Sequence, residues 1–347
     1  MGDVAAHWQL ELSRVGHVGD AMGMDRSNRV IGIDIGGTFG RGIRGALVDG
    51  TGSEITRKEA VRPRTSQEEL IETVITMASR LAELAHRDGA PASALGVAVP
   101  GLVDEALGVV HRSPNLKLQD VELARLLQDR LRVPVFLVRD AGAGALAEYT
   151  LGVGRSVSDM LLVVMGVGVG SAVISGGQVL RGAHGAAGEI GHISIDPAGM
   201  ICGCGGRGCV ETFASETSIA RRYTLAAKEA ILAEEVIAKA TAGNPAAVRV
   251  WNDALGALAT VIATAVALID CELVVLCGTM GIPSEALAPL GTLLANRINL
   301  VQLPRVEVGG LGGDAGLLGA AAVAFERSGA GNPAREWRGS GPVPREL

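Results

Sequence analysis

Short apolar runs alternate along the chain with segments of helical periodicity. Residues 30–35 form the first apolar run, and residues 42–48 and 55–61 follow on either side of a turn at 49–52. These runs predict strands joined by a hairpin. From Ser66 the apolar residues recur every three or four positions, which predicts a capped helix. This order predicts an α/β protein.

The same two patterns continue to the end of the chain. Further strands are predicted at 94–99, 135–138, 160–165, 171–174 and 273–277, and helices at 121–131, 141–151, 216–241, 245–268 and 315–326. A strand, a glycine turn and a second strand occur near residue 35 and again near residue 167. This repetition indicates a duplicated α/β unit with a cleft between its halves.

The repeat also suggests a domain organisation. We expect a weakly structured extension at 1–27 and a mobile tail at 328–347, which is rich in Gly, Pro and Arg. A smaller α/β domain is expected from residues 28–140 together with the final helix at 314–327. A larger α/β domain with a loop-rich insert is expected from residues 141–313.

Composition and charge narrow the class of protein. Hydrophobic residues make up 48% of the 347 residues and charged residues 20%, which supports sizeable cores and excludes global disorder. The net charge of -6, without a basic stripe interleaved with aromatic residues, argues against a nucleic-acid partner. No uninterrupted apolar run reaches the roughly 18 residues of a membrane helix, and no signal-peptide pattern opens the chain. We therefore expect a cytoplasmic protein without a membrane partner.

The first glycine turn carries groups suited to phosphate. Asp34, Gly36, Gly37 and Thr38 lie between two predicted strands. Glycines let backbone N–H groups approach an anion, the threonine hydroxyl adds a donor, and the aspartate can hold a hydrated Mg²⁺ beside the phosphates. The turn is not a P-loop, because no Gly-Lys-Ser/Thr follows it. A plain hairpin turn is the alternative.

A second glycine turn occupies the matching position in the second half. Gly166, Gly168 and Gly170 alternate with valines there. Alone, this pattern also serves tight sheet packing. Paired with the first turn, it predicts a two-sided clamp on a polyphosphate.

One histidine and three cysteines have the spacing of a metal site. His192, Cys202, Cys204 and Cys209 read His-x9-Cys-x-Cys-x4-Cys. Three thiolates and one imidazole complete a tetrahedral zinc site, and a site filled by four protein ligands is structural. The crowding of cysteines indicates a metal in a reducing compartment. Three unbound loop cysteines are the alternative.

Asp140 is the candidate catalytic base. It follows the predicted strand at 135–138 and precedes a predicted helix. Ligands meet α/β sheets at the carboxyl ends of parallel strands, and a carboxylate there can accept the proton of a substrate hydroxyl. A helix N-cap aspartate is the alternative.

Together these motifs resemble the ROK family (repressors, open reading frames, kinases), and in particular its bacterial glucokinase branch. The resemblance covers about residues 29–327. It rests on Asp34 to Thr38, Pro114-Asn115, Asp140, Glu189-x-x-His192 and Cys202, Cys204 and Cys209. It implies an actin-like (ribonuclease H-like) ATPase fold, with two α/β domains flanking a cleft. It also implies ATP- and Mg²⁺-dependent phosphorylation of the primary hydroxyl of a sugar, by a homodimer or homotetramer.

The resemblance assigns roles to individual residues. Asp140 would be the general base. One nitrogen of His192 would bind zinc while the other faces the substrate. Sugar hydroxyls would be contacted by Asn115, Glu189, His192 and Glu211, and Gly278 and Thr279 would lie near the nucleotide.

The chain departs from the family pattern beside the base. Arg139 stands where family kinases usually carry Asn, and Val167 where they commonly carry Thr. Asn offers a donor and an acceptor, whereas Arg offers only donors and a permanent charge. Arg139 is thus expected to meet a substrate acceptor, and a salt bridge to a protein carboxylate or an outward orientation are its alternatives. The resemblance implies that kinases of this branch also act on C7 cyclitols in antibiotic biosynthesis and on amino sugars. With the departure at Arg139, a C7 cyclitol of the valiolone type is expected as the substrate, and glucose or an amino sugar is the alternative.

Two non-enzymatic readings remain beside the kinase. A sugar-responsive repressor needs a helix-turn-helix ahead of the first glycine turn, and the 33 residues before Asp34 carry no basic recognition helix. A catalytically inactive sugar sensor is disfavoured because both Asp34 and Asp140 are present.

Overall fold

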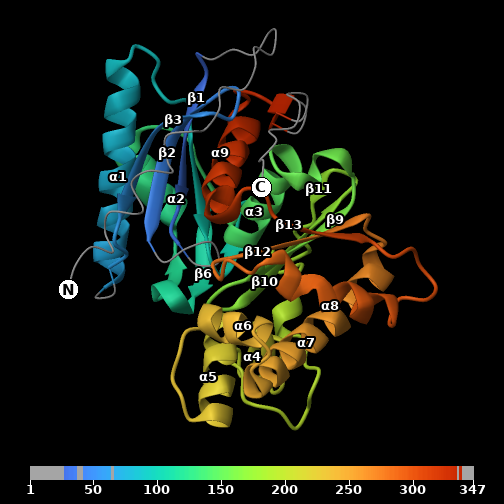
Figure 1. Ribbon diagram of the computed structural model, residues 1–347. Helices are drawn as coiled ribbons and strands as arrows, with labels where there is room; N and C mark the ends of the chain where they lie inside the picture. The colour runs from blue at the N-terminus through green and yellow to red at the C-terminus, as the bar shows by residue number, and fades with distance from the viewer. Residues whose placement is uncertain (1–26, 37–41, 64–65, 334–335, 338–347) are drawn as a thin grey trace.

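Two five-stranded sheets of identical topology form the frame of the molecule (Figure 1). A computed structural model of the chain describes residues 27–36, 42–63, 66–333 and 336–337. The first sheet has the order β3-β2-β1-β4-β8. Its strands are β1 (Arg29–Asp34), β2 (Ile43–Asp49), β3 (Glu54–Ala60), β4 (Leu95–Val99) and β8 (Val135–Arg139).

The second sheet repeats the first. Its order is β11-β10-β9-β12-β13. The strands are β9 (Met160–Met165), β10 (Val169–Ser175), β11 (Gln178–Val179), β12 (Leu273–Gly278) and β13 (Arg305–Val308). In both sheets the first three strands of this order are antiparallel and the last three are parallel. The duplicated unit predicted from the two glycine turns is therefore present.

Helices cover both sheets and separate them. α1 (Gln67–Arg87) and α2 (Leu123–Leu131) pack on one face of the first sheet. α3 (Asp140–Thr150) and α9 (Ala315–Ser328) contribute to one apolar cluster with strands of both sheets, so they lie between them. The far face of the second sheet is covered by α4 (Glu211–Ala214), α5 (Glu216–Ala227), α6 (Ala233–Thr241), α7 (Pro245–Ile269) and α8 (Ser284–Ala295).

Close backbone packing fixes α9 and α3. A side chain on Gly96 in β4 would place its Cβ 1.9 Å from the Ala320 carbonyl oxygen, and one on Gly319 would lie 1.8 Å from the Ala143 oxygen. Only glycine allows these approaches. The last helix of the chain thus packs against the N-terminal sheet and against α3, whose first residue is Asp140.

Two predicted helices differ from the observed ones. The helix expected at 216–241 is broken into α5 and α6, because Lys228 ends α5 in the left-handed conformation (φ 59°). The helix expected from Val121 begins at Leu123, because Val121 ends a strand.

That strand belongs to a small third sheet that the sequence pattern did not indicate. It consists of β5 (Leu102–Asp104), β6 (Val109–Ser113) and β7 (Leu118–Val121). Strands of three to five residues are too short to show a clear alternation. The 3₁₀ turn Pro114–Leu116 joins β6 to β7 and carries Asn115.

In the described part of the chain, α7 is long and apolar enough to cross a membrane by length and composition. It was not expected from uninterrupted apolar runs, because Arg249 and Asp253 divide it. Half of its most apolar window is buried inside the protein. Its apolar residues form part of the core on the outer face of the second sheet, as in the core helix of a globular domain.

Trp337 is packed into the protein, although a mobile tail was expected from Ser328 onward. Its side chain is 1% exposed, and its Nε1 donates a hydrogen bond to the Gly50 carbonyl oxygen at 3.0 Å. Its ring meets the ring of Phe325 edge-on, with 5.6 Å between centroids. The Trp337 side chain therefore packs against α9 and the β2–β3 turn.

Candidate active site and metal centre

Asp140 lies where the parallel strands of the first sheet end. It follows β8 directly and is the first residue of α3, with its side chain buried. Its Oδ1 accepts a hydrogen bond from the Ala141 backbone N–H at 2.8 Å. A carboxylate at this position can act as a general base if a substrate hydroxyl comes within hydrogen-bond reach. The position fits the role expected of Asp140.

Asp34 ends β1, which β4 separates from β8, and is fully buried. Its Oδ1 accepts from Gly36 N at 3.0 Å, and its Oδ2 accepts from Arg44 Nη2 at 2.5 Å. Burial raises the pKa of Asp34, the Arg44 guanidinium opposes this, and the charge of Asp140 adds to the rise. The two carboxyl groups therefore lie within electrostatic reach of each other. Gly37 and Thr38, also expected at this turn, lie outside the described residues.

Arg44 is a site residue that the sequence analysis missed. It lies on β2 directly opposite Asp34 in the strand register, and its Nη1 also lies 3.7 Å from Asp314 Oδ1. An arginine on a strand normally indicates a solvated face. Only the pairing of β1 with β2 shows that it faces the buried aspartate.

The second glycine turn is held by two glutamates of the following helices. Glu216 N donates to the Gly166 carbonyl oxygen at 2.8 Å, and Val169 N donates to Glu211 Oε2 at 3.0 Å. A Cβ on Gly168 would lie 2.4 Å from that same Glu211 oxygen. A side chain at Gly168 would therefore require the Glu211 carboxylate to move.

Gly278 is the last residue of β12, which lies between β9 and β13 in the second sheet, and Thr279 follows it. Gly278 has φ +147°, and a Cβ there would lie 1.8 Å from the Met165 carbonyl oxygen. Thr279 Oγ1 is buried and has no hydrogen-bond partner among the described residues. An orphaned hydroxyl at this edge fits a site completed by a polar ligand, which is what the expected nucleotide would supply.

Arg139 contacts the protein with both of its terminal nitrogens. Nη1 lies 2.5 Å from Glu189 Oε1, while Nη2 donates to the carbonyl oxygens of Ser171 (2.8 Å) and Ala187 (2.6 Å). The side chain is buried. Of the three alternatives expected for Arg139, the structure shows the salt bridge to a protein carboxylate. Ser171 and Ala187 had no signal in the sequence, because they act through backbone oxygens.

The residues expected to contact sugar lie in three places. Glu189 and His192 lie together on the insert, with 3.9 Å between Glu189 Oε2 and His192 Nε2. Asn115 is exposed on the small sheet and lines a cavity of about 240 Å³ together with Arg62 and Lys117. Glu211 lies at the second glycine turn instead, with one oxygen bonded there.

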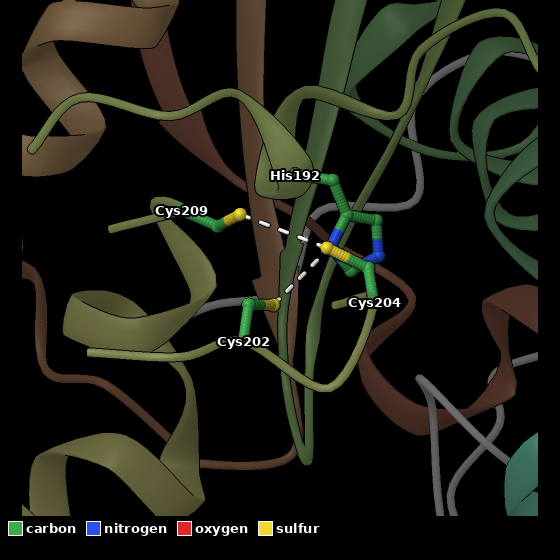
Figure 2. Close-up of side chains that lie close together, drawn as sticks. All are labelled: His192, Cys202, Cys204 and Cys209. Atoms are coloured by element: carbon green, nitrogen blue, oxygen red, sulfur yellow. Dashed lines mark hydrogen bonds between the residues drawn. The ribbon is translucent and has the colours of Figure 1, made fainter. Parts of the chain in front are cut away.

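The four metal-ligand candidates converge (Figure 2). Their donor atoms all lie within 4.8 Å of one another. His192 Nδ1 is 3.6 Å from Cys202 Sγ, and Cys204 Sγ is 3.7 Å from Cys209 Sγ. Tetrahedral bonds of about 2.1–2.3 Å would place ligand atoms roughly 3.5–3.8 Å apart. The cluster therefore fits one zinc ion, and the second nitrogen of His192 faces Glu189.

The thiols of this cluster differ in acidity. Burial raises the pKa of Cys202 to about 12 and raises that of Cys209. The pKa of Cys204 is lowered, because Gly206 N–H donates to its sulfur at 3.4 Å. A bound cation would favour the thiolate form of all three.

The two sheets share one topology, the sequence has a glycine turn between the first two strands of each, and Asp34 and Asp140 are buried in the first half of this α/β protein. The sequence matches the ROK family over residues 30–327, and the chain belongs to this family. The resemblance stated from the motifs is thus confirmed. The fold is confirmed as well, because solved ROK kinases have the actin-like ATPase fold.

Several relatives align along most of the chain. An N-acetylmannosamine kinase of Citrobacter koseri is 35% identical over 85% of this chain and 98% of its own length. A glucokinase of Thermotoga maritima is 32% identical over 87% of this chain and 98% of its own. A putative xylose repressor of Caldicellulosiruptor is 37% identical over 191 residues, and the chain spans only 47% of that protein.

Solved structures agree with these relatives. A ROK hexokinase from Thermus thermophilus has a TM-score of 0.77 and 31% identity, covering 87% of this chain and all of that one. A ROK glucokinase from Streptomyces griseus, solved with glucose and AMPPNP, has a TM-score of 0.71 and 26% identity, covering 86% and 100%.

Proposed function

We propose that this chain is an ATP-dependent carbohydrate kinase that phosphorylates the primary hydroxyl of a hexose. The observation that carries the proposal is Asp140, a buried carboxylate at the end of β8 and the start of α3, next to the buried Asp34. The relatives that align along 85–87% of the chain are named as sugar kinases, and one similar structure holds glucose and an ATP analogue.

In this reaction the substrate hydroxyl oxygen bonds to the γ-phosphorus of ATP and ADP leaves. Asp140 takes the hydroxyl proton. The glycine turns at Gly36 and at Gly166–Gly170 would hold the phosphates through backbone N–H groups, and Asp34 would hold Mg²⁺ through its water shell. A buried carboxylate beside a glycine turn and the orphaned Thr279 hydroxyl fit such a ligand. Mg²⁺ would neutralise charge on the phosphates when bound.

We further infer that the cluster of His192, Cys202, Cys204 and Cys209 holds zinc. Its donor separations match a tetrahedral ion, and all four positions are protein ligands, so the metal would be structural. It would fix the ring of His192 and thereby the sugar-facing nitrogen. A cytoplasmic location and a homodimer or homotetramer remain part of the proposal.

The substrate is proposed to be glucose or an N-acetyl amino sugar. The expectation of a valiolone-type cyclitol, and with it a role in antibiotic biosynthesis, depended on Arg139 reaching a carbonyl or a ring hydroxyl of the substrate. Both terminal nitrogens of Arg139 contact protein oxygens, which weakens that argument. The cyclitol is therefore kept as a comparison substrate.

A coupled ADP-release screen tests the proposal. We expect turnover with glucose, mannose, N-acetylmannosamine or N-acetylglucosamine, measured as kcat/KM and compared with a valiolone-type cyclitol. Higher kcat/KM for the cyclitol would restore the substrate expected from the sequence. Sugar binding without any turnover would contradict the proposed kinase activity.

A further inference from the structure

The guanidinium of Arg139 joins three segments that are distant in sequence. Arg139 ends β8, Ser171 lies in β10, and Ala187 and Glu189 lie on the insert that carries the metal cluster. All three contacts are 2.8 Å or shorter. Arg139 is 7% exposed, whereas the Glu189 side chain is 44% exposed. A buried, fixed cation thus holds a carboxylate that is otherwise open to solvent.

The insert that carries the metal cluster packs closely against the Arg139 guanidinium. Gly188 has φ +89°, and a Cβ there would lie 2.8 Å from Ser171 O and 3.3 Å from Arg139 Nη2. The Ser171 hydroxyl donates to the Gly188 carbonyl oxygen. A side chain at this position would push the insert away from β10.

Arg139 is also anchored from its other side. Its backbone N–H donates to Glu105 Oε1 at 3.2 Å. The other Glu105 oxygen accepts from Arg181 Nε and from Arg327 Nη2, each at 2.7 Å. Two further cations therefore fix the carboxylate that holds the end of β8, immediately before Asp140.

We propose that Arg139 is a positioning residue that fixes Glu189 relative to Asp140, and not a direct contact to the sugar. The inference rests on the proposed function, in which Glu189 accepts a hydrogen bond from a sugar hydroxyl. With Oε1 bound to Arg139, Glu189 presents Oε2 in one direction, beside His192 Nε2. Without the guanidinium, Glu189 would have to be ordered by the sugar itself, and affinity would fall.

The test is a double-mutant cycle on the sugar KM. Arg139→Asn is expected to raise the KM for the sugar about 10- to 100-fold, the size of a charge-assisted hydrogen bond, while kcat changes far less. Arg139→Lys should recover part of the loss. In a Glu189→Ala background, Arg139→Asn should add less than about threefold, because no carboxylate is left to position.

Two controls keep the outcomes distinct. Arg130→Asn removes an arginine from an exposed pair with Glu72 and should leave the KM unchanged. If Arg139→Asn does not fold, the Arg139→Lys and Glu189→Ala variants still complete a cycle. Additive effects of the two sites would overturn the inference and show a direct sugar contact. If the parent protein phosphorylates no sugar, the proposed function has failed, and the same cycle is measured as sugar affinity by calorimetry. Coupling between the two sites then supports the positioning role, and additive effects overturn it.

Discussion

Glu211 Oε2 accepts a hydrogen bond from the Val169 backbone N–H at 3.0 Å, and this bond ties the metal cluster to the second glycine turn. The other Glu211 oxygen lies 3.5 Å from Cys202 Sγ. One carboxylate thus spans the distance between a proposed zinc ligand and a proposed phosphate-binding turn. Changes in the metal cluster should therefore weaken the binding of the nucleotide as well as that of the sugar.

Removal of the metal is the first prediction. Elemental analysis should find close to one zinc per chain, and a strong chelator should lower Tm and weaken both sugar and ATP-analogue binding. Without the metal, the His192 ring is no longer held in one orientation, and Cys202 no longer keeps a fixed position beside Glu211. Zinc-free protein with unchanged affinities would contradict the metal site.

Cysteine variants separate the metal from general packing. Cys204→Ser should reduce the zinc content, because it removes one of four ligands. Cys271→Ser is the matched control: Cys271 is buried but lies outside the cluster, so the variant should keep its zinc even if its Tm falls. Full zinc occupancy in Cys204→Ser would show that the thiol is not a ligand.

The second prediction concerns Asp140. Asp140→Asn keeps the shape of the side chain and removes the proton acceptor, so kcat should fall about 10²- to 10⁴-fold. Binding of an ATP analogue, measured by calorimetry, should stay near that of the parent. Asp129→Asn, at an exposed position in α2, is the matched control and should retain full activity. Turnover of Asp140→Asn within tenfold of the parent would exclude Asp140 as the base.

The third prediction uses the buried charge of Asp34. Burial raises the pKa of Asp34 above the ordinary value of 3.8. Between pH 3.8 and this raised pKa, the Asp34 carboxyl group is therefore protonated in the folded protein and ionised in the unfolded chain. This group therefore makes stability fall as the pH rises from 3.8 through the folded pKa. Asp34→Asn lacks this contribution, and its unfolding free energy should fall less over the same range. The two stability–pH curves, measured by denaturant titration, give the difference directly.

Activity provides the second readout for the same substitution. Asp34→Asn should lose most of its turnover at every Mg²⁺ concentration, since the amide cannot replace the carboxylate beside the phosphates. Parallel stability curves together with normal activity would show that Asp34 serves only to pair with Arg44.

The repeated fold was predictable because its signals are local. Apolar runs with glycine turns between them mark the strands of both sheets, and Ser66 accepts a hydrogen bond from Glu69 N as the predicted helix cap. The metal-ligand candidates were predictable for a similar reason, since their spacing lies within 18 residues of chain. A site whose residues lie close together in the sequence can be predicted without a structure.

Contacts between distant segments were not predictable in this way. The pairing of Arg44 with Asp34 depends on strand register, and that of Arg139 with Glu189 on how the insert folds back. Glu148 is another example: this fully buried carboxylate of α3 accepts backbone N–H bonds from Gly310 (3.2 Å) and Leu311 (2.9 Å). A glutamate within a helix gives no sign of partners more than 160 residues away.

The last prediction concerns Trp337, whose burial the tail composition did not suggest. Its indole N–H bonds the Gly50 oxygen at the β2–β3 turn, its ring packs against Phe325, and a Cβ on Gly52 would lie 3.0 Å from it. Trp337→Ala should lower the unfolding free energy by about 3–5 kcal/mol, the cost of truncating a buried aromatic residue. Trp337→Phe keeps the ring contact and loses the hydrogen bond, so its unfolding free energy should fall by only about 1 kcal/mol. Denaturant titration of the three proteins measures both effects. Equal stability of Trp337→Ala and the parent would show that the segment around residue 337 is not docked in solution, whereas a large loss with unchanged sugar KM would show that it clamps the N-terminal sheet without touching the active site.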